Sequence, residues 1–187
     1  MPVVKKVAMM LGDGFEPVEA IAPVDALRRG GVEVTTVSVM TDRMVMAAQG
    51  VPVVADAQVK EVSFDDFDMI VVPGGSGGVE NLSKCQPLLD ALKDFAAQRK
   101  FIGSICAGPT ILANLQLLGG RKATCYPGCQ TNFPEGVYQD VYDVVRDSNL
   151  ITASGPGQAL DFGIELLRAL EGDKVAEDVA KGMLFER

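Results

Sequence analysis

The sequence predicts an α/β sandwich with a mostly parallel sheet, formed as a single domain over residues 1–187. Short apolar runs, such as Met69–Val72, alternate along the chain with segments whose apolar residues recur at helical spacing. A strand, a helix and a second strand follow one another within 6–39, which is typical of a right-handed parallel βαβ unit. No repeat, low-complexity segment or linker divides the chain, and its length is sufficient for one sizeable core.

The first half of the chain combines buried strands with helices that end at glycine or charged residues. Lys6–Leu11 is predicted as a strand, and the helix that follows, Phe15–Arg29, ends at a glycine pair. Alternation of apolar and polar residues predicts a second strand at Val32–Val39. A small hairpin, a third buried strand and a longer helix are predicted next, at Met44–Ala47 with Val51–Ala55, at Met69–Val72 and at Leu82–Lys100.

The second half begins with a short apolar strand, Phe101–Ile105, and a helix that starts at Pro109 and is closed by Gly119-Gly120. Lys122–Tyr126 is predicted as a further strand, and 127–134 as a loop. The remaining predicted elements are two strands joined by a turn, a long helix and a short helix, at Tyr142–Val145, Leu150–Ala153, Gln158–Leu170 and Lys174–Lys181.

Cys106 stands at the corner between its strand and its helix, which is the position of the nucleophile in a nucleophile elbow. Gly108 permits the close turn, and Pro109 suits the first helical position because its missing N–H costs nothing there. A thiol at a helix N-terminus is expected to form thiolate, the reactive form of cysteine, more readily than a free thiol. An inert buried cysteine is the commoner alternative, but it does not account for the glycine and proline around it.

The absence of histidine narrows the chemistry of this chain. Cys–His and Ser–His–Asp hydrolases and His-ligated metal sites are excluded within it, and a base that acts on Cys106 must be a carboxylate, a lysine, a tyrosine or water. The net charge of −8 argues against nucleic acid and anionic membranes as partners. The N-terminus has no signal-peptide core, so we expect a cytoplasmic, reducing location in which the four cysteines are thiols.

Three loops are expected to meet around Cys106, because ligands of open α/β sheets bind at the carboxyl ends of strands near the point where the strand order reverses. These loops are Gly12–Glu19, Pro73–Gly78 and Cys106–Gly108. Their convergence would place Glu16 or Glu19 on one side of the thiol and the backbone of Gly74-Gly75 on another.

Several features of these loops allow two interpretations. Neither glycine-rich stretch is a nucleotide motif, because Pro17 replaces the third glycine of the dinucleotide fingerprint and Pro73–Gly78 lacks the Lys-Ser/Thr of a phosphate loop. That second loop is either a plain tight turn or a source of N–H donors for an oxyanion. Glu19 is either a helix-start residue that favours the dipole or an acid that acts on the thiol. Cys125 and Cys129 are interpreted as a thiol pair, and no metal or cofactor is predicted.

Four short motifs follow one another along the chain. They are Glu16 and Glu19 followed by Pro23-Val24-Asp25, then Pro73-Gly74-Gly75, Ile105–Thr110 and Gly155-Pro156-Gly157. Together they resemble the ThiJ/PfpI superfamily, and most of all its parkinsonism-associated protein deglycase (DJ-one) branch. The resemblance spans nearly the whole chain and implies a flavodoxin-like three-layer fold and a homodimer.

The resemblance also implies a site. It makes Cys106 the nucleophile and redox thiol, Glu19 the acid hydrogen-bonded to it, and the backbone N–H groups of Gly75 and Ala107 the anion hole. The surrounding pocket would include Glu16, Gly74, Tyr126, Pro127, Ser154 and Gly155. Two residues depart from the family pattern. Tyr126 stands where some members have a histidine, and Ser154 stands where members often have an arginine, so a step through that imidazole and binding of an anionic group at that arginine are both in doubt.

Two functions follow from the residues and the resemblance together. The first is a cofactor-independent thiol enzyme of the glyoxalase III or deglycase type. Such an enzyme would act on small α-oxoaldehydes, or on their protein or nucleotide adducts, through an oxidisable catalytic cysteine. The second is a redox-sensing stress-response chaperone with only incidental catalysis. The expected partners are a small aldehyde substrate and a second copy of the chain, with no nucleic acid and no membrane.

Overall fold

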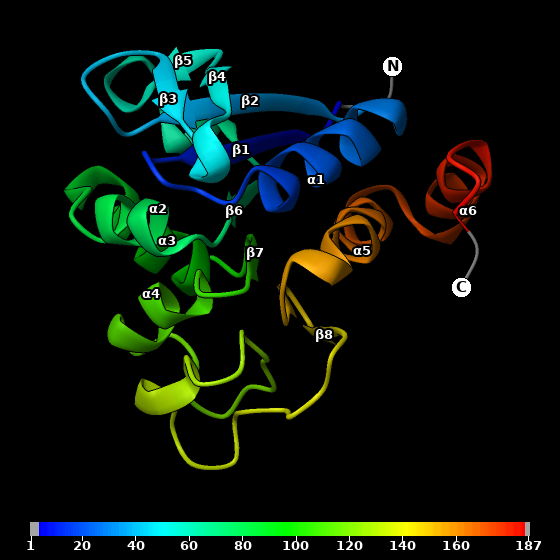
Figure 1. The fold of residues 1–187 in the computed structure, drawn as a ribbon. Coiled ribbons are helices and arrows are strands. Elements are labelled where there is room, and N and C mark those ends of the chain that lie inside the picture. Colours follow the sequence, from blue (N-terminus) through cyan, green and yellow to red (C-terminus); the bar gives the residue numbers. More distant parts are fainter. Residues whose placement is uncertain (1–3, 186–187) are drawn as a thin grey trace.

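The computed structural model describes residues 4–185, so the ends of the predicted domain at 1–3 and 186–187 lie outside the described residues. Its centre is a seven-stranded sheet in the order β5-β2-β1-β6-β7-β9-β8 (Figure 1). Within this sheet the pairs are parallel except for β8 with β9. The strands are Lys6–Leu11 (β1), Glu33–Ser38 (β2), Ala57–Gln58 (β5), Met69–Val72 (β6), Phe101–Ile105 (β7), Val144–Asp147 (β8) and Leu150–Ala153 (β9), beside a separate hairpin of Met44–Met46 (β3) and Pro52–Val54 (β4).

Helices cover both faces of the sheet and make the predicted flavodoxin-like sandwich of three layers (Figure 1). They are Pro17–Arg29 (α1), Ser76–Leu82 (α2), Gln86–Ala97 (α3), Pro109–Asn114 (α4), Ala159–Glu171 (α5) and Asp173–Gly182 (α6). Successive residues of β1 supply the two cores: Val7 and Met9 pack with α1, α5 and α6, whereas Ala8 and Met10 pack with α2, α3 and α4. The predicted buried parallel strands are confirmed by this two-sided burial.

The carboxyl ends of β1, β6 and β7 meet where the strand order reverses. From β1 the chain adds β2 and β5 on one side, and it then adds β6, β7 and β9 on the other. The predicted hairpin, β3 with β4, is confirmed and is joined to the loop after β1. Gly14 N donates to Met46 O at 2.7 Å, and Ala48 N donates to Phe15 O at 2.8 Å. The short strand β5 was not predicted, because two residues carry no recognisable alternation.

The segment predicted as one helix after the glycine-rich loop is two helices. The α2 helix begins at Ser76, so the loop itself is only Pro73-Gly74-Gly75, and the chain leaves helical structure before α3. Pro87 explains the break, because proline is accepted in the first turn of a helix and disrupts a helix interior. Gly78 lies within α2 because a Cβ there would come within 2.6 Å of the Phe15 Cα atom, so close packing outweighs low helix propensity.

The predicted strand at Lys122–Tyr126 is wrong. Only an isolated bridge joins Ala123 to Tyr138 there, and the N–H of Thr124 donates to the side chain of Thr152 at 2.9 Å instead of to a neighbouring strand. Side-chain hydrogen bonding thus replaces a ladder.

Other boundaries differ by small amounts from the prediction. The α4 helix ends at Asn114, well before the glycine pair, because Gln116 takes a left-handed φ of +60°. The β8 strand runs over Val144–Asp147 instead of Tyr142–Val145. None of the helices in residues 4–185 combines the length and the apolar composition that crossing a membrane requires.

Candidate functional site

The backbone at Cys106 has the strained conformation of a nucleophile elbow. Its φ is +61°, in the left-handed region that non-glycine residues rarely occupy. Both backbone polar groups are held: Cys106 N donates to Ala153 O at 2.9 Å, and Cys106 O accepts from Tyr126 N at 2.8 Å. Pro109 then starts α4, as predicted. The neighbouring strand and the segment at Tyr126 therefore fix the Cys106 backbone at the end of β7.

Glu19 is buried against this elbow. Its side chain is fully inaccessible to solvent, and its Oε2 accepts a hydrogen bond from Gly74 N at 2.8 Å. Burial raises the pKa of this carboxyl from 4.5 to about 7, whereas hydrogen bonds from the Cys106 thiol and from Gly74 lower it and the charge of Glu16 raises it further. Glu19 does not cap its own helix, because the N–H of Glu16 donates to Gly74 O at 3.0 Å instead, and its role as an acid stays a prediction.

The second oxygen of Glu19, Oε1, is buried without a hydrogen bond of good geometry among residues 4–185. The Cys106 thiol is nevertheless near enough to lower the pKa of the carboxyl. The two oxygens of a carboxylate can only accept hydrogen bonds, and burying an acceptor without a donor costs free energy of folding. A proton on Glu19 would turn this oxygen into a donor toward the sulfur.

The two glycines after β6 are packed so closely that no side chain would fit at either position. A Cβ on Gly74 would lie 2.5 Å from Glu19 Oε2 and 2.7 Å from Cys106 Cβ. Gly75 has a φ of +85°, and a Cβ there would collide with Gly14 O and come within 2.6 Å of Glu16 N. This loop is thus pressed between the elbow and the loop after β1, as the predicted convergence of the three loops requires.

The expectation that the elbow lowers the pKa of the thiol is not met. Burial, and after it the charge of and hydrogen bond with Glu19, raise the pKa of Cys106 to about 12, although the backbone N–H groups of Ala107 and Gly75 donate toward the sulfur and act in the opposite direction. The α4 helix, whose dipole would lower the thiol pKa, has only six residues, whereas the Glu19 carboxyl, which raises it, lies directly beside the thiol. Two such close groups titrate as a pair, so the proton shared by Glu19 and Cys106 decides the charge on sulfur.

Four predicted pocket residues lie together beside the elbow. A hollow of about 370 Å³ is lined by Tyr126, Pro127, Tyr142, Ser154, Gly155, Pro156, Gly157 and Gln158. The Tyr126 ring packs over Gly155, and the buried Ser154 hydroxyl donates to Gln158 Oε1 at 2.9 Å. Tyr142 and Gln158 were missed by sequence reasoning. The spacing of four residues between Ser154 and Gln158, across the Gly-Pro-Gly turn, was the available signal for the second.

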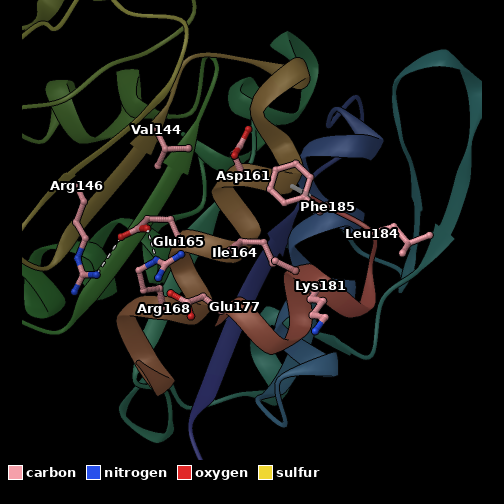
Figure 2. Close-up of a pocket in the computed structure, with 11 residues that line it drawn as sticks. Val144, Arg146, Asp161, Ile164, Glu165, Arg168, Glu177, Lys181, Leu184 and Phe185 are labelled. Carbon is pink, nitrogen blue, oxygen red and sulfur yellow. Dashed lines mark hydrogen bonds and ion pairs between the residues drawn. The ribbon is translucent and has the colours of Figure 1, made fainter. Parts of the chain in front are cut away.

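A second hollow, of about 840 Å³, lies elsewhere, between β8, α5 and α6 (Figure 2). Its charged side chains are largely paired with one another: Glu165 accepts from Arg146 and from Arg168, each at 3.1 Å, and Arg168 also reaches Asp173 at 2.7 Å. None of the residues predicted for chemistry lines it. The larger hollow is thus separate from the candidate site residues that gather at Cys106. Within residues 4–185 no cluster of three or more Cys, Asp and Glu residues could hold a metal ion.

The chain is similar to known proteins over nearly its whole length. "Protein dj-1beta" of Drosophila melanogaster is 34% identical over 181 residues, which cover 96% of this chain and 97% of that protein. "Glutathione-independent glyoxalase DJR-1.2" of Caenorhabditis elegans is 34% identical over 173 residues, which cover 92% of this chain and 91% of that protein. The solved structure "Toxoplasma gondii DJ-1, oxidized" has a TM-score of 0.94 at 32% identity and covers 98% of this chain and 100% of its own.

The sequence profile of the DJ-1/PfpI family matches residues 5–169, which include each strand of the main sheet and the elbow. The site geometry and the whole-chain similarity agree with this match, and the chain belongs to the DJ-1/PfpI family.

Proposed function

We propose that this protein is a cofactor-independent thiol enzyme that acts on small α-oxoaldehydes or on their adducts with amino groups. The observation that carries the proposal is the arrangement at one sulfur atom. The Cys106 sulfur accepts hydrogen bonds from the backbone N–H groups of Gly75 and Ala107 and lies beside Glu19. The pKa of Glu19, about 7, lets this carboxyl hold or release a proton near neutral pH. The glyoxalase name of the worm relative supports the same substrate class.

The reaction would begin when the pair Cys106 and Glu19 carries one proton in total. With that proton on Glu19, sulfur is a thiolate and adds to the aldehyde carbon to form a hemithioacetal. The N–H groups of Gly75 and Ala107 stabilise the oxyanion, which takes the proton from Glu19. Glu19, now a carboxylate, moves the proton from the former aldehyde carbon to the neighbouring carbonyl carbon, and the hydroxyl proton of the hemithioacetal passes to the oxygen of that neighbouring carbon, which gives a thioester. Water then releases a 2-hydroxy acid and returns the proton to the pair, without net oxidation or reduction.

The charges around the site favour a neutral substrate. Glu16 lies near enough to Glu19 to raise its pKa, and Ser154, whose hydroxyl is occupied by Gln158, offers no positive charge. An anionic group would thus meet acidic side chains and no cation from these residues. A small uncharged dicarbonyl such as methylglyoxal fits this environment better than a substrate with a carboxylate.

Turnover of methylglyoxal to lactate by the wild type, Cys106→Ser and Cys85→Ser tests the proposal. We expect Cys106→Ser to lose activity by about two orders of magnitude or more, because the serine hydroxyl cannot ionise beside Glu19. Cys85→Ser is the matched control, since Cys85 lies at the start of α3 and away from the three site loops, and it should keep the wild-type rate. A wild-type rate equal to that of free thiol would contradict the proposal.

A redox-sensing role is the second candidate, and the same donors support it. A sulfinate on Cys106 would place oxygens where the N–H groups of Gly75 and Ala107 and a protonated Glu19 can donate to them. We expect mild peroxide to add two oxygens to Cys106 before the other cysteines react, with activity lost in parallel. Peptide mass spectrometry after graded peroxide treatment measures this. First oxidation at Cys85 would contradict the assignment of Cys106 as the reactive thiol.

We also propose a homodimer that uses α1 and the hairpin. Large apolar side chains are exposed on both: Val18 and Ile21 on α1, and Met44 and Met46 on β3, each by more than 40%. Adjacent exposed apolar groups of this kind mark association surfaces, and a two-fold dimer would close the assembly. Sedimentation of the wild type and of Ile21→Glu at micromolar concentration tests it. A dimer that becomes a monomer in the variant is expected, whereas a monomeric wild type would refute the dimer.

A further inference from the structure

The thiol pair at Cys125 and Cys129 takes no part in the reaction above, yet it lies beside the site. Tyr126 follows Cys125 directly, and its N–H donates to the carbonyl of Cys106 at 2.8 Å. Tyr126 and Pro127 also line the hollow next to the elbow, with Gly155. The segment between the two cysteines is therefore part of the pocket wall.

One backbone oxygen holds both members of the pair. The Tyr126 carbonyl accepts a hydrogen bond from the Cys125 thiol at 3.4 Å and another from the Cys129 N–H at 2.9 Å. The second bond closes a tight turn with Pro127 at its first central position and Gly128, at a φ of +93°, at its second, which is the pattern of a type II turn. The turn thus folds Cys129 back over the carbonyl to which the Cys125 sulfur points.

Both cysteines are reduced, and they differ in exposure: Cys125 is buried, and Cys129 is partly exposed. Their thiols also interact electrostatically, since Cys129 adds to the effect of burial in raising the pKa of Cys125 to about 12. Figure 1 shows the segment between α4 and β8 at the opposite end of the molecule from the β3–β4 hairpin.

We propose that Cys125 and Cys129 form a reversible disulfide across the turn that carries Tyr126 and Pro127, as a second peroxide-responsive site beside the hollow next to the elbow. A hydroperoxide first oxidises the more accessible Cys129 thiol to a sulfenic acid and is itself reduced to an alcohol, or to water if it is hydrogen peroxide. The Cys125 sulfur then attacks the Cys129 sulfur, the S–S bond forms, and the sulfenic oxygen leaves as water with the remaining thiol proton.

The disulfide would lock the turn and so fix the wall of the pocket. Cys125 could no longer donate to the Tyr126 carbonyl, and the new bond would set the positions of Tyr126 and Pro127 relative to the elbow. Disulfides that close small exposed loops are readily reduced, which suits a reversible response. Cys106, by contrast, is expected to proceed to sulfinate, so the two sites would record peroxide in different chemical forms.

The test uses the full chain carrying Cys106→Ser, so that the nucleophile cannot compete for peroxide. The protein is treated with excess hydrogen peroxide, the remaining thiols are blocked, and the tryptic peptide 123–146, which contains both cysteines, is weighed with and without prior reduction. We expect this peptide to lose two hydrogens and to regain them on reduction with dithiothreitol. The same protein with Cys129→Ser added should show no such loss, and one with Cys85→Ser added should behave like the parent.

A peptide that gains oxygen without losing hydrogens, that remains unreacted, or that becomes linked to another peptide or to a second chain would overturn the proposal. Because the readout is a mass and not a rate, failure of methylglyoxal turnover would leave this result unaffected. A protein whose thiols are all oxidised to sulfinate would count against the pair as well.

Discussion

The two thiol regions of this protein have the same reactive atom in opposite surroundings. Cys106 is fixed at the end of a central strand, with its backbone strained to a φ of +61° and a buried acid beside it. Cys125 and Cys129 lie in an irregular segment that a single turn folds together. The first region holds one sulfur beside N–H donors and a carboxyl group, whereas in the second the Cys129 thiol helps to raise the pKa of Cys125. The difference teaches that the neighbours of a cysteine set its chemistry, and it is the reason why we propose addition to a carbonyl for the first region and disulfide formation for the second.

The largest expected effect concerns the cost of burying Glu19. Its pKa in the folded protein is about 7, above its ordinary 4.5, so the folded state holds the proton more tightly. Its contribution to stability is therefore complete below about pH 4.5 and declines as the pH rises through 7. Glu19→Gln removes this dependence and keeps an oxygen for the Gly74 N–H, so it should raise the free energy of unfolding at about pH 8 by at most about 3 kcal/mol.

Denaturant unfolding of both proteins between about pH 4 and pH 8 measures this difference. The control is Glu135→Gln, which removes an exposed carboxyl group and should leave the pH dependence as in the wild type. Equal stabilities of wild type and Glu19→Gln across this range would show that Glu19 ionises in the folded protein as easily as in the unfolded chain.

The next effect distinguishes which atom of the pair holds the proton. If Glu19 carries the shared proton near pH 7, Cys106 reacts as a thiolate, and Glu19→Gln should slow alkylation by iodoacetamide near neutral pH about tenfold or more. The rate is followed at Cys106 by mass spectrometry as a function of pH. Faster alkylation of the variant would mean instead that Glu19 is the anion and that its charge suppresses the thiolate. Alkylation of Cys129 is the internal control and should not change.

The smallest effect tests the turn of the second region. Gly128 has a φ of +93°, and a Cβ added there would have no neighbour within 4 Å, so Gly128→Ala meets only backbone strain. We expect a loss of about 1 kcal/mol in the free energy of unfolding. Gly119→Ala, at a glycine with equally open space and no left-handed φ, should change the stability little. A loss in both variants alike would mean that the turn imposes no special conformation.

The element order and the turn at Cys106 could be predicted from the sequence, because they depend on local pattern. Apolar runs of strand length and the Gly-Pro step after Cys106 indicated the central strands and the elbow. The absence of a strand at Lys122–Tyr126 could not be predicted from local pattern. The β-like composition of this segment is overridden when Thr124 donates to the side chain of Thr152, a residue distant in the sequence. The break before α3 had a local signal in Pro87, and it was missed.

The surroundings of each candidate side chain were decided only by the tertiary structure. The sequence placed Glu19 at a helix start and could not choose between a capping role and an acid role. Packing of α1 against the loop after β6 buries it, directs one oxygen to Gly74 N and raises its pKa. The helix start at Cys106 predicted a lowered thiol pKa, yet burial and Glu19 raise it. Desolvation and charge pairing depend on which distant segments meet, and a single sequence contains that information only through the fold.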